Sequence, residues 1–110
     1  MKTINYKELD VMKNPHGVEA KKLLETEHSQ VIHMNLKAGE SLKRHTTPVD
    51  VFFYVLEGDV EIGEEKVLVK KDTLIESPKG IPHCLYNESK GDFRVLVVKT
   101  PCPTKPTEVK

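Results

Sequence analysis

Residues 78–87 read Pro-Lys-Gly-Ile-Pro-His-Cys-Leu-Tyr-Asn and are the most informative stretch of this 110-residue chain. Pro78 and Gly80 favour a tight turn, because proline fixes φ and glycine is free to adopt a positive φ. Pro82 then stiffens the start of a short strand, and His83 lies at its entrance. A histidine that a turn holds at the end of a strand is well placed to bind a metal or a small molecule.

Written as a pattern, this stretch is P-x-G-x-x-H-x-x-x-N, which resembles the second motif of the cupin superfamily, whose histidine binds metal. Upstream, Gly39, His45 and Gly58 fall at the spacing of the first cupin motif, G-x5-H-x-H-x3-E-x6-G. The two motifs and the segment between them, residues 39–87, cover about half of the chain. The resemblance implies an all-β fold, the double-stranded β-helix or jelly-roll barrel, with a binding site inside the barrel.

The chain departs from these motifs at three positions. Thr47 stands where the first motif has its second histidine, and Val51 stands where it has a glutamate. Asp72 replaces the glycine that opens the second motif. Of the four metal ligands that the resemblance implies, only His45 and His83 are kept, so the metal site is expected to be depleted.

Two histidines are a small ligand set for a divalent metal such as Fe, Mn or Zn. Catalytic zinc and non-haem iron sites generally have three protein ligands. Asp50, next to the lost glutamate position, is a candidate third ligand if a bulge turns it inward, although a shift of one residue ordinarily sends a side chain to the opposite face. We therefore expect no fully coordinated site, and a metal held by His45, His83 and Asp50 or water stays an alternative.

The rest of the sequence is patterned mainly for β-structure. Besides the strand after Pro82, strands are expected at residues 17–24, 30–36, 41–45, 51–56, 60–62, 66–69, 73–76 and 93–99. Many short strands between turn residues are typical of a sandwich or barrel. We expect a single domain over residues 1–100, followed by a proline-rich tail at residues 101–110 that cannot supply a central strand.

Strand parity predicts a pocket inside the barrel. The candidate substrate-pocket residues are Thr47, Val51, Phe53 and Asn87, with Val55, Met34 and Leu36 as further walls. An apolar cavity with a few convergent polar groups is the usual make-up of a small-molecule site. Asn87 also has a purely structural interpretation, because asparagine side chains often stabilise turns.

Other residues with reactive side chains are expected to have no role in the site. The remaining histidines, which we expect at the surface, are His16, His28 and His33. Cys84 points away from His83 by strand parity, and the two cysteines, Cys84 and Cys102, have no C-x-x-C spacing. Free thiols in a reducing compartment are therefore expected.

Composition argues against several classes of partner. Lys and Arg balance Asp and Glu, which gives a formal net charge of zero, so no nucleic-acid or anionic-membrane footprint is indicated. The polar start at residues 1–10 and the lack of a long apolar run predict a cytoplasmic protein. The resemblance implies a homodimer, and Phe52 and Tyr54, on the outer face of an apolar strand, favour one locally.

Three functions fit these observations. The first is binding of a small polar molecule, such as a sugar or an organic acid, with His45 and His83 as neutral hydrogen-bonding groups. The second is a metal-dependent dioxygenase or isomerase that uses His45, His83 and Asp50 or water. The third is a metal-free enzyme similar to the sugar-nucleotide epimerases of the superfamily, which requires a carboxylate to orient a histidine base and a tyrosine acid in the pocket. The sequence places neither of these, and whether the protein is an enzyme stays open.

Overall fold

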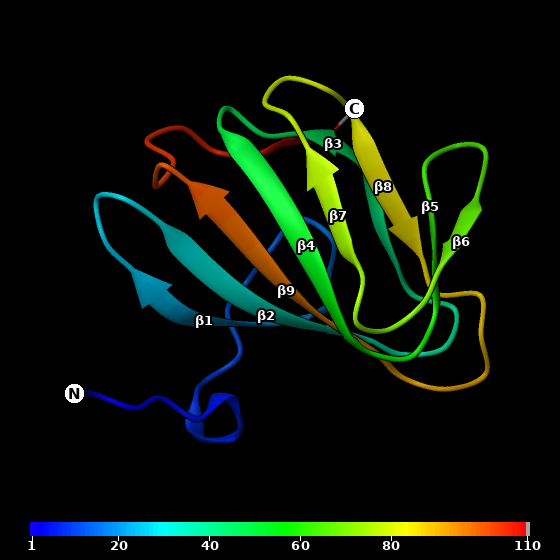
Figure 1. The fold of residues 1–110 in the computed structure, drawn as a ribbon, viewed down its shortest axis with the longest axis horizontal. Coiled ribbons are helices and arrows are strands. Elements are labelled where there is room, and N and C mark those ends of the chain that lie inside the picture. The colour runs from blue at the N-terminus through cyan, green and yellow to red at the C-terminus, as the bar shows by residue number, and fades with distance from the viewer. Residues whose placement is uncertain (110) are drawn as a thin grey trace.

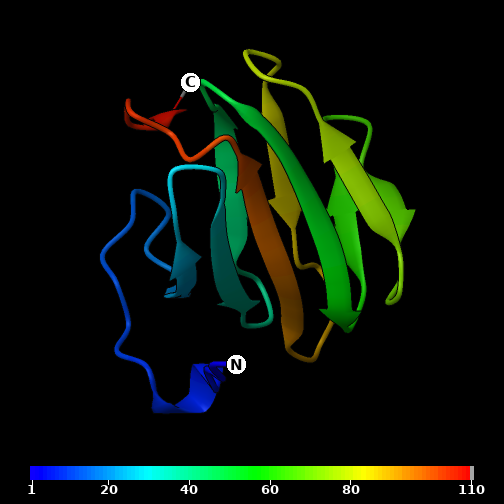
Figure 2. The ribbon, with the colours of Figure 1, turned by 60° about the vertical axis from the view of Figure 1, so that its left-hand side comes forward.

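In residues 1–109, the part of the chain that this computed structural model describes, ten strands form two antiparallel five-stranded sheets that face each other as a jelly-roll barrel (Figures 1 and 2). The elements are η1 (Tyr6–Glu8), β1 (Glu19–Glu25), β2 (Gln30–Leu36), β3 (Ser41–Thr46), β4 (Asp50–Glu57), β5 (Val60–Ile62), β6 (Val67–Val69), β7 (Leu74–Ser77), β8 (His83–Tyr86), β9 (Phe93–Thr100) and β10 (Glu108–Val109). The expected all-β jelly roll is confirmed. None of the helical structure in residues 1–109 has the length and apolar character needed to cross a membrane.

The strand order explains how the site is assembled. The first sheet has the order β1-β2-β9-β4-β7, and the second has the order β10-β3-β8-β5-β6. The strands that carry the two motif histidines, β3 and β8, are neighbours at the centre of the second sheet. They therefore face the apolar inner side of β4 and β9 across the barrel.

In the first sheet, β4 and β9 build the core by alternation of buried and half-buried residues. In β4 the side chains of Val51, Phe53 and Val55 are buried, while the residues between them are only half-buried. β9 follows the same alternation and contributes Phe93 and Val95 to the same core. Because successive residues of a strand point to opposite faces, this pattern turns one apolar face of each strand into the barrel.

The two glycines of the first motif both take positive φ, but their surroundings differ. Gly58, in the turn after β4, has a φ of 81°, and an added Cβ would lie 2.4 Å from the carbonyl oxygen of Asp92. Gly39 has a φ of 87°, and an added Cβ would meet no atom within 4 Å. At position 58, glycine is therefore required because two backbone segments approach closely. At position 39, glycine is favoured only because the backbone has a positive φ.

The proline-rich tail returns to the barrel. In Figure 1 it runs from the end of β9 to β3, where Glu108 pairs with Thr46 and Val109 with His45. The pairing residues of β10 follow the last proline of the tail, Pro106, and so all have an N–H to donate. The tail thus supplies a short edge strand, and its prolines remain in the connection.

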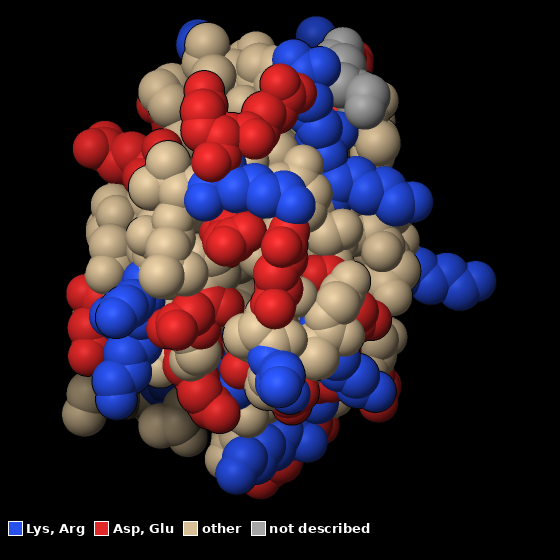
Figure 3. Space-filling model, turned by 90° about the vertical axis from the view of Figure 1, so that its right-hand side faces the viewer, with Lys and Arg blue, Asp and Glu red and all other residues tan. Residues whose placement is uncertain are grey.

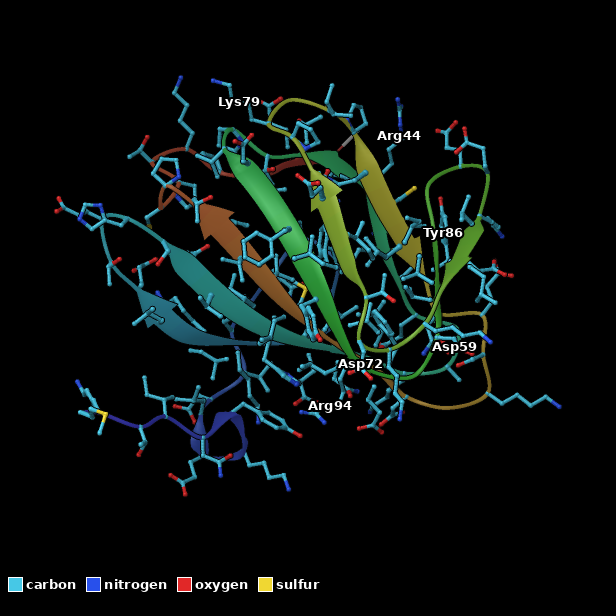
Figure 4. The ribbon with its side chains drawn as sticks, viewed as in Figure 1. Arg44, Asp59, Asp72, Lys79, Tyr86 and Arg94 are labelled. Carbon is cyan, nitrogen blue, oxygen red and sulfur yellow. The ribbon has the colours of Figure 1, made fainter. Side chains whose placement is uncertain are left out.

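The N-terminal segment packs on the outside of the first sheet and buries His33, which the sequence had indicated as a surface residue. The Tyr6 ring of η1 stacks on His33 with 4.0 Å between ring centroids, and the Arg94 guanidinium lies 4.8 Å from the centre of the Tyr6 ring. Arg94, at the end of the sheet near η1 in Figure 4, donates from Nε to His33 Nε2 at 3.1 Å. The surface expectation for His33 is wrong because η1 covers it and leaves it 1% exposed. His28, as expected, is exposed.

Candidate functional site

A cavity of about 340 Å³ lies between the two sheets, at the end where the tail crosses. Its apolar wall includes Ile32, Met34, Val51, Phe53 and Val97. Its polar lining includes His16, His45, Thr47, His83 and Lys99, and the tail residues Pro103, Lys105, Pro106 and Thr107 border it. The volume is at the lower end of the range of about 300–1,000 Å³ that is usual for small-molecule sites.

His45 and His83 meet inside this cavity. They are paired residues of β3 and β8, next to an irregularity in the register between Leu42 and His45. Their Nε2 atoms are 2.7 Å apart, and their rings are nearly perpendicular, at 84°. The ring of Phe53 packs edge-to-face with His83, with 5.3 Å between the ring centroids. The two motif histidines, 38 positions apart in the chain, are thus in direct contact.

The contacts of the two Nδ1 atoms determine which nitrogen of each ring carries the proton. His45 Nδ1 lies 2.5 Å from the carbonyl oxygen of Lys43, which can only accept, so His45 Nδ1 donates. In neutral His45 the Nε2 atom is then an acceptor, and His83 Nε2 must donate to it. His83 Nδ1 is left to accept from the Ser77 hydroxyl at 2.5 Å. One consistent chain of hydrogen bonds therefore runs from Ser77 through His83 and His45 to Lys43.

Both imidazoles are uncharged at neutral pH. Burial, with smaller contributions from the nearby His45, Lys99 and His16, lowers the pKa of His83 to about 3. Burial also lowers the pKa of His45, and the hydrogen bond to Lys43 opposes this only in part. Neutral rings fit the hydrogen-bond chain, in which His45 Nε2 must stay unprotonated to accept from His83.

His16 is a third histidine of the site that the sequence did not indicate. The expectation of a surface position is wrong for it: His16 lines the cavity, with 4.5 Å between its ring centroid and that of His45. Its Nδ1 accepts from the backbone N–H of Lys43 at 3.0 Å, and burial lowers its pKa to about 4. Asn14 holds the turn by accepting from the backbone N–H of His16. Nothing in the local pattern reveals this contact, because its partner lies 27 residues away.

The other candidate residues fall into two groups. Thr47, Val51 and Phe53 line the cavity, and the Thr47 hydroxyl donates to the carbonyl of Val49 at 3.1 Å. Asn87 does not line it, because its buried amide donates to the carbonyls of Leu36 and Gly91 and holds the loop before β9. This is the structural interpretation of Asn87 that the sequence had left open.

Asp50 lies outside the cavity. Its side chain is exposed and accepts from the backbone N–H of Lys79 at 3.0 Å, which ties the start of β4 to the turn of the second motif. Val51, the next residue, has the inward position. The structure therefore does not bring Asp50 to the two histidines, as strand parity requires.

The residues of the site do not form a complete ligand set for a metal. Two facing Nε2 atoms, each with its Nδ1 held by an oxygen, are arranged like the ligands of a metal site. Among residues 1–109, however, no group of three or more His, Cys, Asp or Glu is placed to hold an ion. His16 already uses Nδ1 to accept from Lys43, so its neutral form has a proton on Nε2. Two nitrogen ligands do not fit a resident catalytic metal, for which three protein ligands are usual.

Comparison with known proteins identifies the family. A family model described as a cupin domain matches residues 32–99. TT1209 from Thermus thermophilus is 30% identical, with 94% of this chain and 100% of that chain covered and a TM-score of 0.77. The uncharacterized protein MJ0764 from Methanocaldococcus jannaschii is 26% identical over 87 residues, which are 76% of this chain and 75% of that protein.

The polyketide cyclase RemF from Streptomyces resistomycificus has a TM-score of 0.84 over 99% of this chain and 84% of that chain. At 19% identity this likeness concerns the fold alone. The family model, by contrast, spans most of the barrel, from β2 to β9, and includes both histidine motifs. This chain therefore belongs to the cupin family.

Proposed function

We propose that this cupin binds a small polar organic molecule in its cavity, with His45 and His83 as uncharged hydrogen-bonding groups. The observation that carries the proposal is the 2.7 Å contact between the two Nε2 atoms. Ser77 holds the Nδ1 atom of His83, and the carbonyl of Lys43 holds the Nδ1 atom of His45. This arrangement presents one N–H donor and one nitrogen acceptor side by side. A ligand hydroxyl can donate to His45 and accept from His83 at once, so it can replace the contact between the rings.

The cavity around the pair supports the same proposal. Phe53, Met34 and Val97 provide an apolar wall, and the polar groups converge at one place. Such a wall with few polar groups is suited to one small ligand, because the wall supplies hydrophobic contact and the polar groups set orientation. The name of RemF, a polyketide cyclase, is compatible with a small organic ligand in this fold, although that likeness is one of fold.

The two catalytic alternatives have less support. A metal-dependent dioxygenase or isomerase needs a further ligand, and Asp50 is engaged with Lys79 outside the cavity. An epimerase-like enzyme needs a carboxylate and a tyrosine beside a histidine base, and neither residue type lines the cavity in residues 1–109. The binding function therefore accounts best for the residues present.

We also propose that the protein acts in the cytoplasm. Cys84 and Cys102 are both free thiols, which fits a reducing compartment.

The test uses the histidine side chains as reporters. Wild-type protein with ¹⁵N-labelled histidine is titrated with three classes of probe: neutral sugars, aliphatic and aromatic monocarboxylates, and their amides. We expect at least one class to shift the imidazole signals of His45 and His83 and to raise the melting temperature. His83→Ala is expected to lose this response, whereas His28→Ala, at an exposed position, keeps it. If no class shifts these signals at millimolar concentration, the proposal is wrong.

A further inference from the structure

Lys99 is a charged residue of the cavity that the hydrogen-bond chain does not use. It lies near the end of β9, paired with Gln30 of β2 on one side and Val51 of β4 on the other. It shares its strand face with Val97, which is buried in the core, so its side chain enters the cavity. Its ammonium donates to the Thr107 hydroxyl of the tail at 3.5 Å, a long contact. None of the six ion pairs found among residues 1–109 involves Lys99.

The Lys99 ammonium has an unfavourable free energy in this position unless an anion binds next to it. It is half-buried, and burial lowers its pKa. Removing a charge from water costs free energy unless a partner compensates it. Glu25, an acidic residue near the tail, already accepts from Lys22 and Gln30. Within residues 1–109 the cavity therefore contains a half-buried positive charge that no ion pair neutralises.

The charge around the whole cavity has one sign. Lys13 and Lys105 also line it, and in residues 1–109 no Asp or Glu does so. This contrasts with the chain as a whole, which has 17 basic and 17 acidic residues. It also contrasts with the face in Figure 3, where Lys and Arg are interspersed with Asp and Glu. A cavity with charges of one sign and apolar walls concentrates ions of the opposite sign.

We infer that the ligand of this cavity is a small organic monocarboxylate, whose carboxylate binds the Lys99 ammonium and whose apolar body packs against Val97, Met34 and Phe53. The inference deepens the proposed function and rests on it. A carboxylate is favoured over a phosphate because no arginine lines the cavity in residues 1–109, and of the three lysines that line it Lys99 is half-buried while Lys13 and Lys105 are exposed. Phosphate groups are usually bound by arginine or by several donors together.

The experiment compares ligands of one shape and different charge. Benzoate, benzamide and phenyl phosphate are titrated separately into the full-length protein, and affinity is measured from the imidazole signals of His45 and His83. We expect benzoate to bind at least about tenfold more tightly than benzamide, the size of one charge-assisted hydrogen bond. Lys99→Met keeps the length of the side chain and is expected to abolish this preference. Lys70→Met, at an exposed position that does not line the cavity, is the matched control and is expected to retain it.

The outcomes separate this inference from the proposed function. If benzamide or a neutral sugar shifts the histidine signals and benzoate has no advantage, the cavity binds a polar molecule but the carboxylate inference is wrong. A preference for benzoate that persists in Lys99→Met also contradicts it, and so does tighter binding of phenyl phosphate. If no compound shifts the signals, both the inference and the proposed function fail.

Discussion

At Gly58 two backbone segments come so close that only a hydrogen atom fits between them. We predict that Gly58→Ala lowers the free energy of unfolding by more than Gly39→Ala does. Both glycines have positive φ, for which a residue with a Cβ incurs about 1–2 kcal/mol. Only Gly58→Ala also forces a contact with the Asp92 carbonyl, so its total loss should exceed about 2 kcal/mol. Urea unfolding of both variants measures the difference, and equal losses would contradict the account.

His33 makes stability depend on pH. Burial and the charge of Arg94 lower its pKa to about 4 in the folded protein, whereas an unfolded chain has the ordinary value of about 6.5. The unfolded state therefore binds more protons between these two values, so stability from this residue is present above about pH 6.5 and is lost as pH falls toward 4. We predict that in His33→Gln the free energy of unfolding depends less steeply on pH between about 4 and 6.5. The decrease in slope should correspond to at most one bound proton.

The measurement is chemical denaturation at a series of pH values between 4 and 7.5. His28→Gln, which changes an exposed histidine, is the control and should leave the slope as it is in the wild type. If His33→Gln has the wild-type slope, then His33 is not held uncharged by burial beneath η1.

Motif spacing was enough to predict that His45 and His83 belong to one site, because both spacings place a histidine where a strand meets a turn. It was not enough for Ser77, His16 or Lys99. His16 and Lys99 line the cavity, and Ser77 bonds to His83, through contacts that depend on the complete barrel. His16 and its partner Lys43, for example, are 27 positions apart in the chain. A single chain contains no local pattern for such contacts.

Among the elements, the strands with regular alternation could be predicted and the two terminal segments could not. The alternation of β4 and β9 reflects burial of one face, which can be read from residue types. η1 and β10 are short, and tertiary contacts hold them: the Tyr6 ring on His33, and the pairing of Val109 with His45. Local propensity has little influence on segments of two or three residues.

The tail is an element that should detach without loss of the barrel. It contributes no residue to the buried core, but it covers one edge of β3. We predict that a variant ending at Pro101 folds normally and that backbone amides of β3 exchange faster in deuterated water, because one edge loses its partner. β9 is the internal control, since β2 and β4 flank it on both sides. Unchanged exchange in β3 would show that β10 does not pair with it in solution.

The outer face of the first sheet has a group of neighbouring apolar side chains, which is unusual for a face in contact with water. Across β2, β9 and β4, the outward residues Val31, Val98 and Phe52 lie side by side in register, and Leu96 lies beside Tyr54 in the next outward row. All five are only half-buried in the single chain. A contiguous apolar patch of this kind usually marks an interface, and we propose that a second copy of the chain covers it.

We predict that the wild type is a homodimer by light scattering coupled to gel filtration and that Val98→Glu is a monomer. The added carboxylate would be buried without a partner in the interface, which is strongly unfavourable. Val67→Glu is the matched control, because Val67 is exposed on β6 of the other sheet. A monomeric wild type, or a Val98→Glu variant that remains dimeric, would contradict the proposed interface.

We propose that His45 and His83 bond to each other in the free protein and to an organic ligand when it binds, and that they do not hold a resident metal. Elemental analysis of untagged protein tests it most directly, after incubation with iron, manganese and zinc and removal of loosely bound ions. We predict metal far below one equivalent in the wild type, because the site offers two nitrogen ligands where three are usual. Near-stoichiometric metal that both His45→Ala and His83→Ala abolish would contradict the account.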